Sequence, residues 1–133
     1  MTSTYSRDFS QNLKEHEWKN RVVLILKNSS KNEIFENQLT VLKLNKDGLR
    51  ERKIIVYSIE PTKYQRGTDP DENEFFSTKL YQKFNEQNKD FKIVLIGLDG
   101  FVKLEQSEFL PIETLFAKID TMPVRRNELN TKQ

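Results

Sequence analysis

Two groups of residues in this chain have the types and spacing needed to bind an anion. The first is Ser29-Ser30-Lys31, which follows an apolar run and precedes an amphipathic segment. A helix beginning there would offer backbone N–H groups and the positive end of its dipole to a carboxylate or phosphate. Ser30 and Glu33 also have the spacing of a capping box, so helix capping alone explains the same residue types and is the simpler interpretation.

The second group is Arg125 and Arg126, whose guanidinium groups could hold an anion through paired hydrogen bonds. Arg50, Arg52 and Lys53 would strengthen such a site if the fold brought them close. A solvated tail or internal salt bridges would also explain these residues and are the simpler interpretation. The sequence therefore offers two candidate anion sites, each with a structural alternative.

The other chemically suggestive residues form no complete motif. His16 lies between Glu15 and Glu17 in a polar segment, so we expect it at the surface. The segment Asp69-x-Asp71-x-Asn73 resembles the start of a calcium loop, but it lacks the later glycine and glutamate, so helix capping is expected and metal is not. Arg21, beside a buried strand, is expected to form a structural ion pair or to stack on an aromatic ring.

The composition excludes several classes of function. The 133 residues include no cysteine and one histidine, which excludes a dithiol oxidoreductase, a cysteine peroxidase and a multi-histidine metal site. With 22 basic and 20 acidic residues, the net charge of +2 provides no general attraction for nucleic acid. No membrane span, signal peptide or cofactor is expected, and the compartment and oligomeric state are left open.

Four apolar runs predict the strands of a sheet. Residues 21–26 and 53–59 are rich in β-branched side chains, as is typical of interior parallel strands. Residues 91–97 and 101–105 flank Asp99-Gly100, a pair that favours the tight turn of an antiparallel hairpin.

Apolar residues at helical spacing predict three helices between these strands. The first begins at the Ser30 cap, continues to about Asp47 and ends at Gly48. The second begins at the Asp69 cap and ends near Asn88, and the third occupies residues 111–122 until Pro123 stops it.

This order of elements predicts one α/β domain, β-α-β-α-β-β-α, with a mixed four-stranded sheet flanked by helices. Residues 1–20 are predicted to form an arm packed on the domain, 21–123 the domain itself and 124–133 a polar tail. Residues 60–68 contain proline and glycine among polar side chains, so they are expected to form a surface loop.

Four stretches spread along the chain carry a resemblance to a known family. They are Trp18-Lys19-Asn20-Arg21, then Gly48-Leu49 with Arg52, then Ile96-Gly97-Leu98-Asp99-Gly100 with Val102-Lys103-Leu104, and finally Ile119-Asp120-Thr121-Met122-Pro123 with Arg125, Arg126 and Glu128. In them the chain resembles an uncharacterised family of thioredoxin-like domains, found in bacterial proteins and repeated in vertebrate extracellular-matrix proteins. The resemblance implies a thioredoxin-like fold and no known activity.

The same resemblance indicates that redox chemistry is absent. Redox relatives of this fold carry a reactive cysteine near the start of the helix after the first core strand, a position that corresponds here to Asn28-Ser29-Ser30-Lys31. Serine forms no thiolate, and the proline that precedes the third core strand in redox members is missing from Lys89-Asp90-Phe91.

We therefore expect a non-redox binding or protein-interaction module whose partner is a protein or a small anionic ligand. One alternative is an enzyme that acts on an anionic substrate through Arg125 and Arg126. A second alternative is a matrix or cell-surface adhesion module, which follows only from the vertebrate resemblance.

Overall fold

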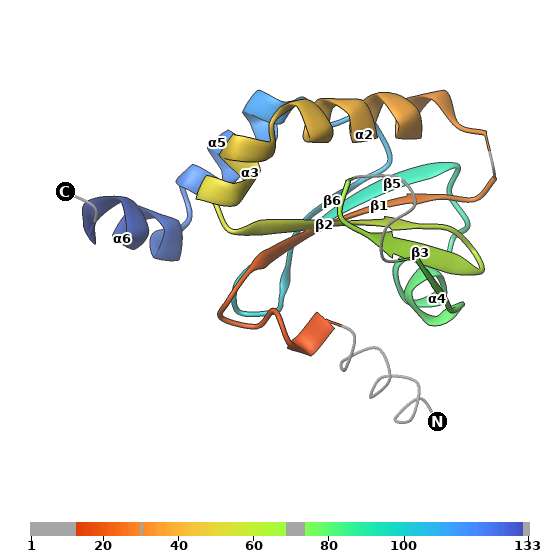
Figure 1. The fold of residues 1–133 in the computed structure, drawn as a ribbon, viewed down its shortest axis with the longest axis horizontal. Coiled ribbons are helices and arrows are strands. Elements are labelled where there is room, and N and C mark those ends of the chain that lie inside the picture. The colour runs from red at the N-terminus through yellow and green to blue at the C-terminus, as the bar shows by residue number, and fades with distance from the viewer. Residues whose placement is uncertain (1–12, 30, 69–73, 132–133) are drawn as a thin grey trace.

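The computed structural model describes residues 13–29, 31–68 and 74–131, which form one α/β unit (Figure 1). The elements in chain order are β1 (Arg21–Lys27), α2 (Glu33–Leu44), α3 (Lys46–Glu51), β2 (Ile54–Ile59), β3 (Lys63–Arg66), β4 (Glu74–Phe76), α4 (Lys79–Phe84), β5 (Phe91–Ile96), β6 (Val102–Gln106), α5 (Ile112–Asp120) and α6 (Pro123–Thr131).

The strands form one mixed sheet in the order β4-β3-β2-β1-β5-β6. Strands β1 and β2 are parallel, with Arg21 opposite Ile54, and every other neighbouring pair is antiparallel. The four predicted strands are confirmed. The predicted four-stranded sheet is wrong, because β3 and β4 extend it to six strands.

The two additional strands come from residues that were predicted to be a loop and the start of a helix. Tyr64 of β3 is the one fully buried residue in these two strands, and its ring lies 5.9 Å from that of Tyr57 and 5.2 Å from that of Phe75. Phe76, which lies within the range of the predicted second helix, is 81% exposed in β4. Only α4 remains of that helix, and the predicted Asp69 cap lies outside the described residues.

The first helix also differs from its prediction at both ends. Asn32, not Ser30, caps α2 by accepting a hydrogen bond of 2.9 Å from the Phe35 backbone N–H; Ser30 itself lies outside the described residues. Gly48 does not end the helix but lies inside α3, where a Cβ atom would be 2.6 Å from the Phe116 ring. Glycine is therefore required here for close packing.

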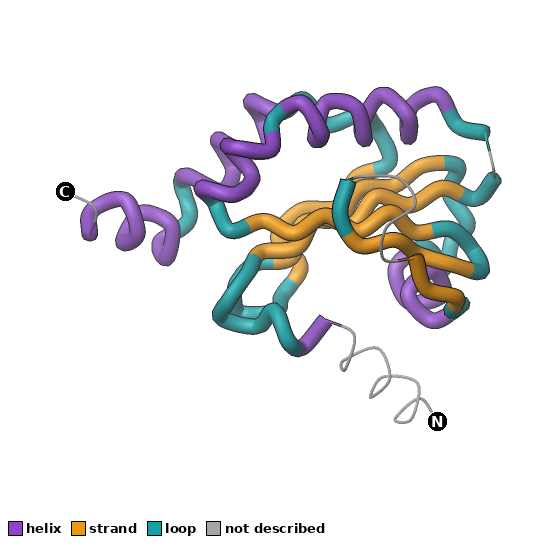
Figure 2. Tube along the Cα trace, in the orientation of Figure 1, coloured by secondary structure: helices purple, strands orange, loops and turns teal. Residues whose placement is uncertain are grey.

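Helices cover both faces of the sheet and enclose two apolar clusters (Figures 1 and 2). Helices α2, α3 and α5 contribute Phe35, Leu42, Leu49, Leu115 and Ile119 to the cluster on one face. Helix α4 contributes Leu80, Tyr81 and Phe84 to the cluster on the other. None of the helices in the described part of the chain could cross a membrane.

Near both ends of the domain, the described residues differ from their sequence predictions. Pro123 begins α6 instead of ending the helical region, so much of the predicted polar tail is helical. Arg125 of this helix is 1% exposed. In the predicted arm, His16 is buried at 2% exposure, which contradicts its expected surface position, while Trp18 is 64% exposed.

Candidate ligand-binding site

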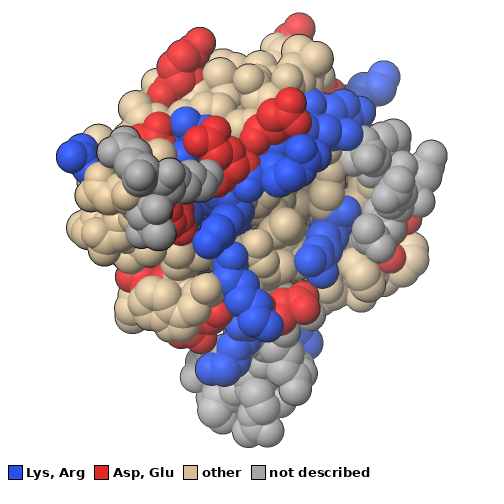
Figure 3. Space-filling view, turned by 60° about the vertical axis from the view of Figure 1, so that its left-hand side comes forward, with Lys and Arg blue, Asp and Glu red and all other residues tan. Residues whose placement is uncertain are grey.

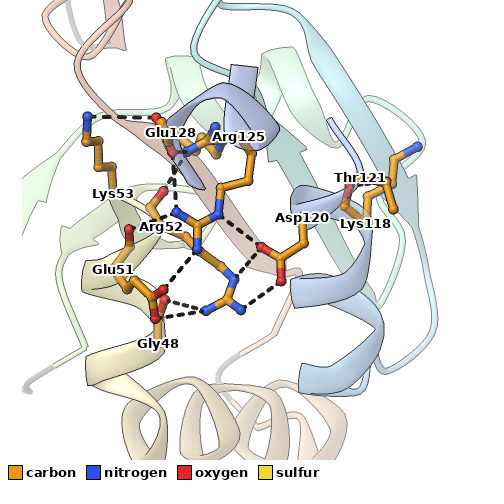
Figure 4. Close-up of polar contacts among 10 residues, drawn as sticks. Gly48, Glu51, Arg52, Lys53, Lys118, Asp120, Thr121, Arg125 and Glu128 are labelled. Carbon is orange, nitrogen blue, oxygen red and sulfur yellow. Dashed lines mark hydrogen bonds and ion pairs between the residues drawn. The ribbon is translucent and has the colours of Figure 1, made fainter. Parts of the chain in front are cut away.

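Arg125 is surrounded by carboxylates at the end of the molecule where α3, α5 and α6 meet (Figure 4). Its Nε lies 3.0 Å from Asp120, its Nη2 3.1 Å from Glu51 and its Nη1 3.4 Å from Glu128. Each guanidinium nitrogen therefore already contacts an acceptor. An incoming anion could bind Arg125 only by displacing one of these carboxylates.

Arg52 also binds the Asp120 carboxylate (Figure 4). Its Nε and Nη2 donate to the two oxygens of Asp120 at 3.1 and 2.9 Å, a fork-like geometry that only an arginine provides. The guanidinium also lies 3.9 Å from the centroid of the Phe116 ring. Asp120 thus joins α3 to α6 through two arginines.

Arg21, at the start of β1, completes this group. It donates from Nη1 to the Arg52 carbonyl at 2.8 Å and lies 3.5 Å from Glu128, so the predicted structural ion pair of Arg21 is confirmed. We call Arg21, Arg52, Arg125, Glu51, Asp120 and Glu128 the arginine cluster. Its three cations and three anions balance in formal charge.

Burial and ion pairing have opposite effects on the pKa of three residues of the cluster, Asp120, Arg125 and Arg21. Burial alone would raise the pKa of Asp120, but hydrogen bonds from Arg52 and Arg125 outweigh burial and lower it. Burial would lower the pKa of Arg125, and its carboxylate partners raise it instead. For Arg21 burial is the larger effect, so its pKa is lowered despite Glu128.

The other predicted basic residues are divided between this cluster and the surface. Lys53 reaches it, with Nζ 3.7 Å from Glu128. Arg126 is exposed on α6, and Arg50 is exposed beside Asp47. The structure therefore brings Arg125 together with Arg52 and Lys53, but it does not form a joint anion clamp with Arg126.

The β1–α2 junction has the position expected for the other candidate site. The Ser29 hydroxyl donates to the Lys31 carbonyl at 2.8 Å, and the side chain of Lys31 is exposed. The side-chain oxygen of Asn32 accepts a hydrogen bond from the Phe35 N–H, and its backbone carbonyl accepts one from the Glu36 N–H. These contacts favour capping over anion binding at this helix end.

A pocket of about 440 Å³ adjoins the arginine cluster, and we call it the Trp18 pocket. It lies between the segment before β1, the β5–β6 turn and the α5–α6 junction. Residues that line it include Trp18, Arg21, Leu98, Lys118, Met122 and Val124. Arg21 is 1% exposed, and its Nε is a buried polar atom without a hydrogen-bond partner in the described structure.

Trp18 stands at this pocket with an unusual backbone. Its φ of 65° is in the left-handed region, which bulky residues rarely adopt. The conformation is held by the hydrogen bond from the Trp18 N–H to the Leu98 carbonyl, 2.7 Å long. The indole is therefore kept largely exposed by a strained turn of the kind that often occurs at functional sites.

Charged residues at the β5–β6 turn form another wall of the pocket. Lys103 Nζ lies 2.8 Å from Asp99, and this hydrogen bond helps to lower the pKa of Asp99. The Lys103 side chain passes over Gly97, where a Cβ atom would lie 2.6 Å from it. Lys118, exposed near the α5 end, carries a further positive charge (Figure 4).

The sequence did not identify this pocket as a site, although it contained a signal. Three of the four stretches that carry the family resemblance supply its lining, through Trp18 and Arg21, Gly97 to Asp99, and Thr121 to Pro123. These stretches are far apart in the chain, and only the fold shows that they converge.

His16 forms a separate buried contact. Its Nε2 lies 2.9 Å from the Tyr57 hydroxyl, and its Nδ1 lies 3.1 Å from the Asn20 amide nitrogen. Burial and Arg66 lower the pKa of His16. Within residues 13–29, 31–68 and 74–131, no cluster of three or more acidic or histidine side chains could hold a metal ion; the Asp69 to Asn73 segment lies outside them.

Comparison with known proteins gives a family and no activity. No curated protein matches the chain. The model of the family described as domain of unknown function DUF4174 matches residues 12–128, which include the arginine cluster and the Trp18 pocket. Because this match covers most of the sequence, the chain belongs to the DUF4174 family.

Proposed function

We propose that this protein is a non-redox binding module with a thioredoxin-like fold, and that its ligand occupies the Trp18 pocket. The strand order β2-β1-β5-β6 supports the fold, since it combines one parallel pair with an antiparallel hairpin as the β-α-β-α-β-β-α order requires. The absence of cysteine supports binding without thiol chemistry.

The observation that carries the proposal is the unpartnered Nε of Arg21. A buried N–H group without an acceptor costs about 1–3 kcal/mol, and a ligand oxygen in the pocket would supply that acceptor. Glu128, the carboxylate nearest to Arg21 among the described contacts, is 3.5 Å from Nη1 and is shared with Arg125. A negatively charged ligand group is therefore favoured over a neutral one.

Trp18 supports an apolar or aromatic part in the same ligand. An exposed indole offers a flat face for stacking, and Leu98, Met122 and Val124 provide further apolar surface. The volume of about 440 Å³ is in the range of small-molecule sites. The ligand class is thus a small aromatic or apolar carboxylate.

The alternative functions have less support. An enzyme that uses Arg125 on its substrate would have to displace carboxylates from all three nitrogens of its guanidinium group. A matrix or cell-surface adhesion role rests on the sequence resemblance alone.

Intrinsic fluorescence tests the proposal, because Trp18 is the only tryptophan. Benzoate should change the emission of the protein saturably, with a dissociation constant on the order of millimolar, as is usual for so small a fragment. It should also shift the Arg21 Nε–H signal in NMR spectra. Benzyl alcohol, which lacks the carboxylate, should bind more weakly.

Two variants with matched exposure provide the control. Val124 and Ile34 are 42% and 43% exposed, and only Val124 lines the pocket. Val124→Phe should fill the mouth of the pocket and abolish benzoate binding, while Ile34→Phe should leave it unchanged. Linear, unsaturable quenching, or equal binding by both variants, would contradict the proposal.

A further inference from the structure

A second cavity, a groove of about 430 Å³, lies beside the first half of β2. Its walls come from α3, from the start of β2 and from the end of β3. We call it the basic groove, because its lining includes Lys46, Arg50, Lys53 and Arg66. None of the described lining residues is acidic. The chain as a whole has a net charge of only +2, so this is a local concentration of positive charge.

One face of the molecule carries a band of Lys and Arg side chains (Figure 3). Acidic residues lie along its edges, and uncharged residues lie beside it. Such an arrangement produces a positive potential over the groove that would attract small anions.

The ion pairs of these cations are open to competition. Arg50 lies 3.0 Å from Asp47, but the two side chains are 76% and 98% exposed, and Arg66 lies 3.4 Å from the exposed Glu15. Pairs in water contribute little to stability, so a ligand can replace such partners at small cost. Lys53 shares its partner: the carboxylate of Glu128 also contacts Arg21 and Arg125, so its negative charge is divided among three cations.

The floor of the groove combines apolar side chains with an open strand edge. Leu49, Ile54 and Val56 are buried there, and a low-dielectric wall strengthens the attraction between nearby charges. Strand β3 pairs with Tyr57 to Ile59, so no described strand pairs with the outer edge of β2 at Ile54. The Arg21 N–H donates to the Lys53 carbonyl, which directs the backbone groups of Ile54 toward that outer edge.

We propose that the basic groove binds a small anion carrying two or more phosphate groups. Two arginines can each hold phosphate oxygens in a fork, and two lysines supply further charge. This site is separate from the Trp18 pocket and does not depend on the function proposed for it.

Calorimetric titration with inorganic pyrophosphate and orthophosphate tests this site. The unmodified protein should bind pyrophosphate more tightly than orthophosphate, because the two phosphate groups of pyrophosphate can contact cations on both walls of the groove at once. The double variant Lys46→Gln/Arg50→Gln should lower pyrophosphate affinity by roughly tenfold or more, as expected for the loss of charge-assisted hydrogen bonds. Arg66→Gln, on the opposite wall, should weaken binding independently.

The control removes the same amount of charge elsewhere. Lys83 and Lys89 are exposed in α4 and in the segment after it, and neither lines the groove, so Lys83→Gln/Lys89→Gln should retain affinity for pyrophosphate. Trp18→Leu should also retain it, which separates this site from the Trp18 pocket. Equal losses in the two double variants, or no pyrophosphate binding at millimolar concentration by the folded protein, would overturn the proposal.

Discussion

Asp120 is the residue on which the arginine cluster depends most, because one carboxylate binds both Arg52 and Arg125. In Asp120→Asn, the amide keeps one oxygen and loses the charge, which leaves the buried Arg125 less compensated. We expect the free energy of unfolding to fall by about 2 kcal/mol, less than for a fully buried pair because Asp120 is 35% exposed. Urea denaturation measures this change.

Asp47→Asn provides the matched control for that prediction. The substitution is chemically identical and also removes an arginine partner, but Asp47 is 98% exposed. The free energy of unfolding should change by no more than about 0.5 kcal/mol. Similar losses for the two variants would show that burial of the cluster contributes nothing.

The environment of a single residue could be predicted from the sequence when its charge, next to a buried segment, implied an ion-pair partner. Arg21 precedes a buried strand, which already indicated an ion pair, and Arg125 was open to internal salt bridges. His16 was misplaced because its partner, the Tyr57 hydroxyl, is 41 positions away and gives no local signal. The unpartnered Nε of Arg21 could not be inferred from sequence for the same reason: it depends on a three-dimensional arrangement of contacts.

At the scale of elements, the contact between Gly48 and Phe116 joins α3 to α5. Alanine normally stabilises a helix interior relative to glycine by about 1 kcal/mol. Here the added methyl group would clash with the Phe116 ring. The guanidinium group of Arg52 also packs on this ring, which limits how far the ring can move. We expect Gly48→Ala to lower the free energy of unfolding by about 1 kcal/mol net, because overpacking exceeds the helical gain.

A double-variant cycle distinguishes this clash from an effect on the helix alone. In a Phe116→Leu background the ring is absent, so Gly48→Ala should become neutral or stabilising. The urea midpoints of the four proteins provide the coupling energy. A destabilisation of the same size in both backgrounds would contradict the proposed contact.

Elements marked by an apolar run or by a distinctive turn were predicted well, and those with neither signal were not. Strand β1 is buried at every position, and its apolar run revealed it directly. Strand β3 buries only Tyr64, so its sequence is that of a polar loop. The helix before Pro123 ends there as predicted, but α6 was missed, because proline is also well suited to the first position of a new helix.

Across the whole molecule, one histidine should dominate the pH dependence of stability near neutrality. Burial lowers the pKa of His16 below 6.5, and the charges of Arg66 and Lys19 add to this, while Glu15 opposes it. The unfolded chain therefore binds the proton at higher pH than the folded one. The free energy of unfolding should decrease as the pH falls below about 6.5, and it should level off below the folded pKa.

Guanidinium denaturation between about pH 7.5 and about pH 5 measures this slope. In His16→Gln, which retains a hydrogen-bonding side chain, the slope across this range should largely disappear. NMR titration of the single imidazole gives the folded pKa independently. A folded pKa at or above 6.5 would contradict the prediction.

The ion pair between Arg21 and Glu128 has a consequence for when the chain can fold during its synthesis. The two residues are 107 positions apart, so Arg21 leaves the ribosome long before its carboxylate partner has been synthesised. Until then, burying the first strand would also bury an uncompensated cation, which disfavours early folding. We therefore expect the native domain to form only after translation has passed residue 128, and proteolysis of ribosome-arrested chains should find shorter ones still sensitive to cleavage.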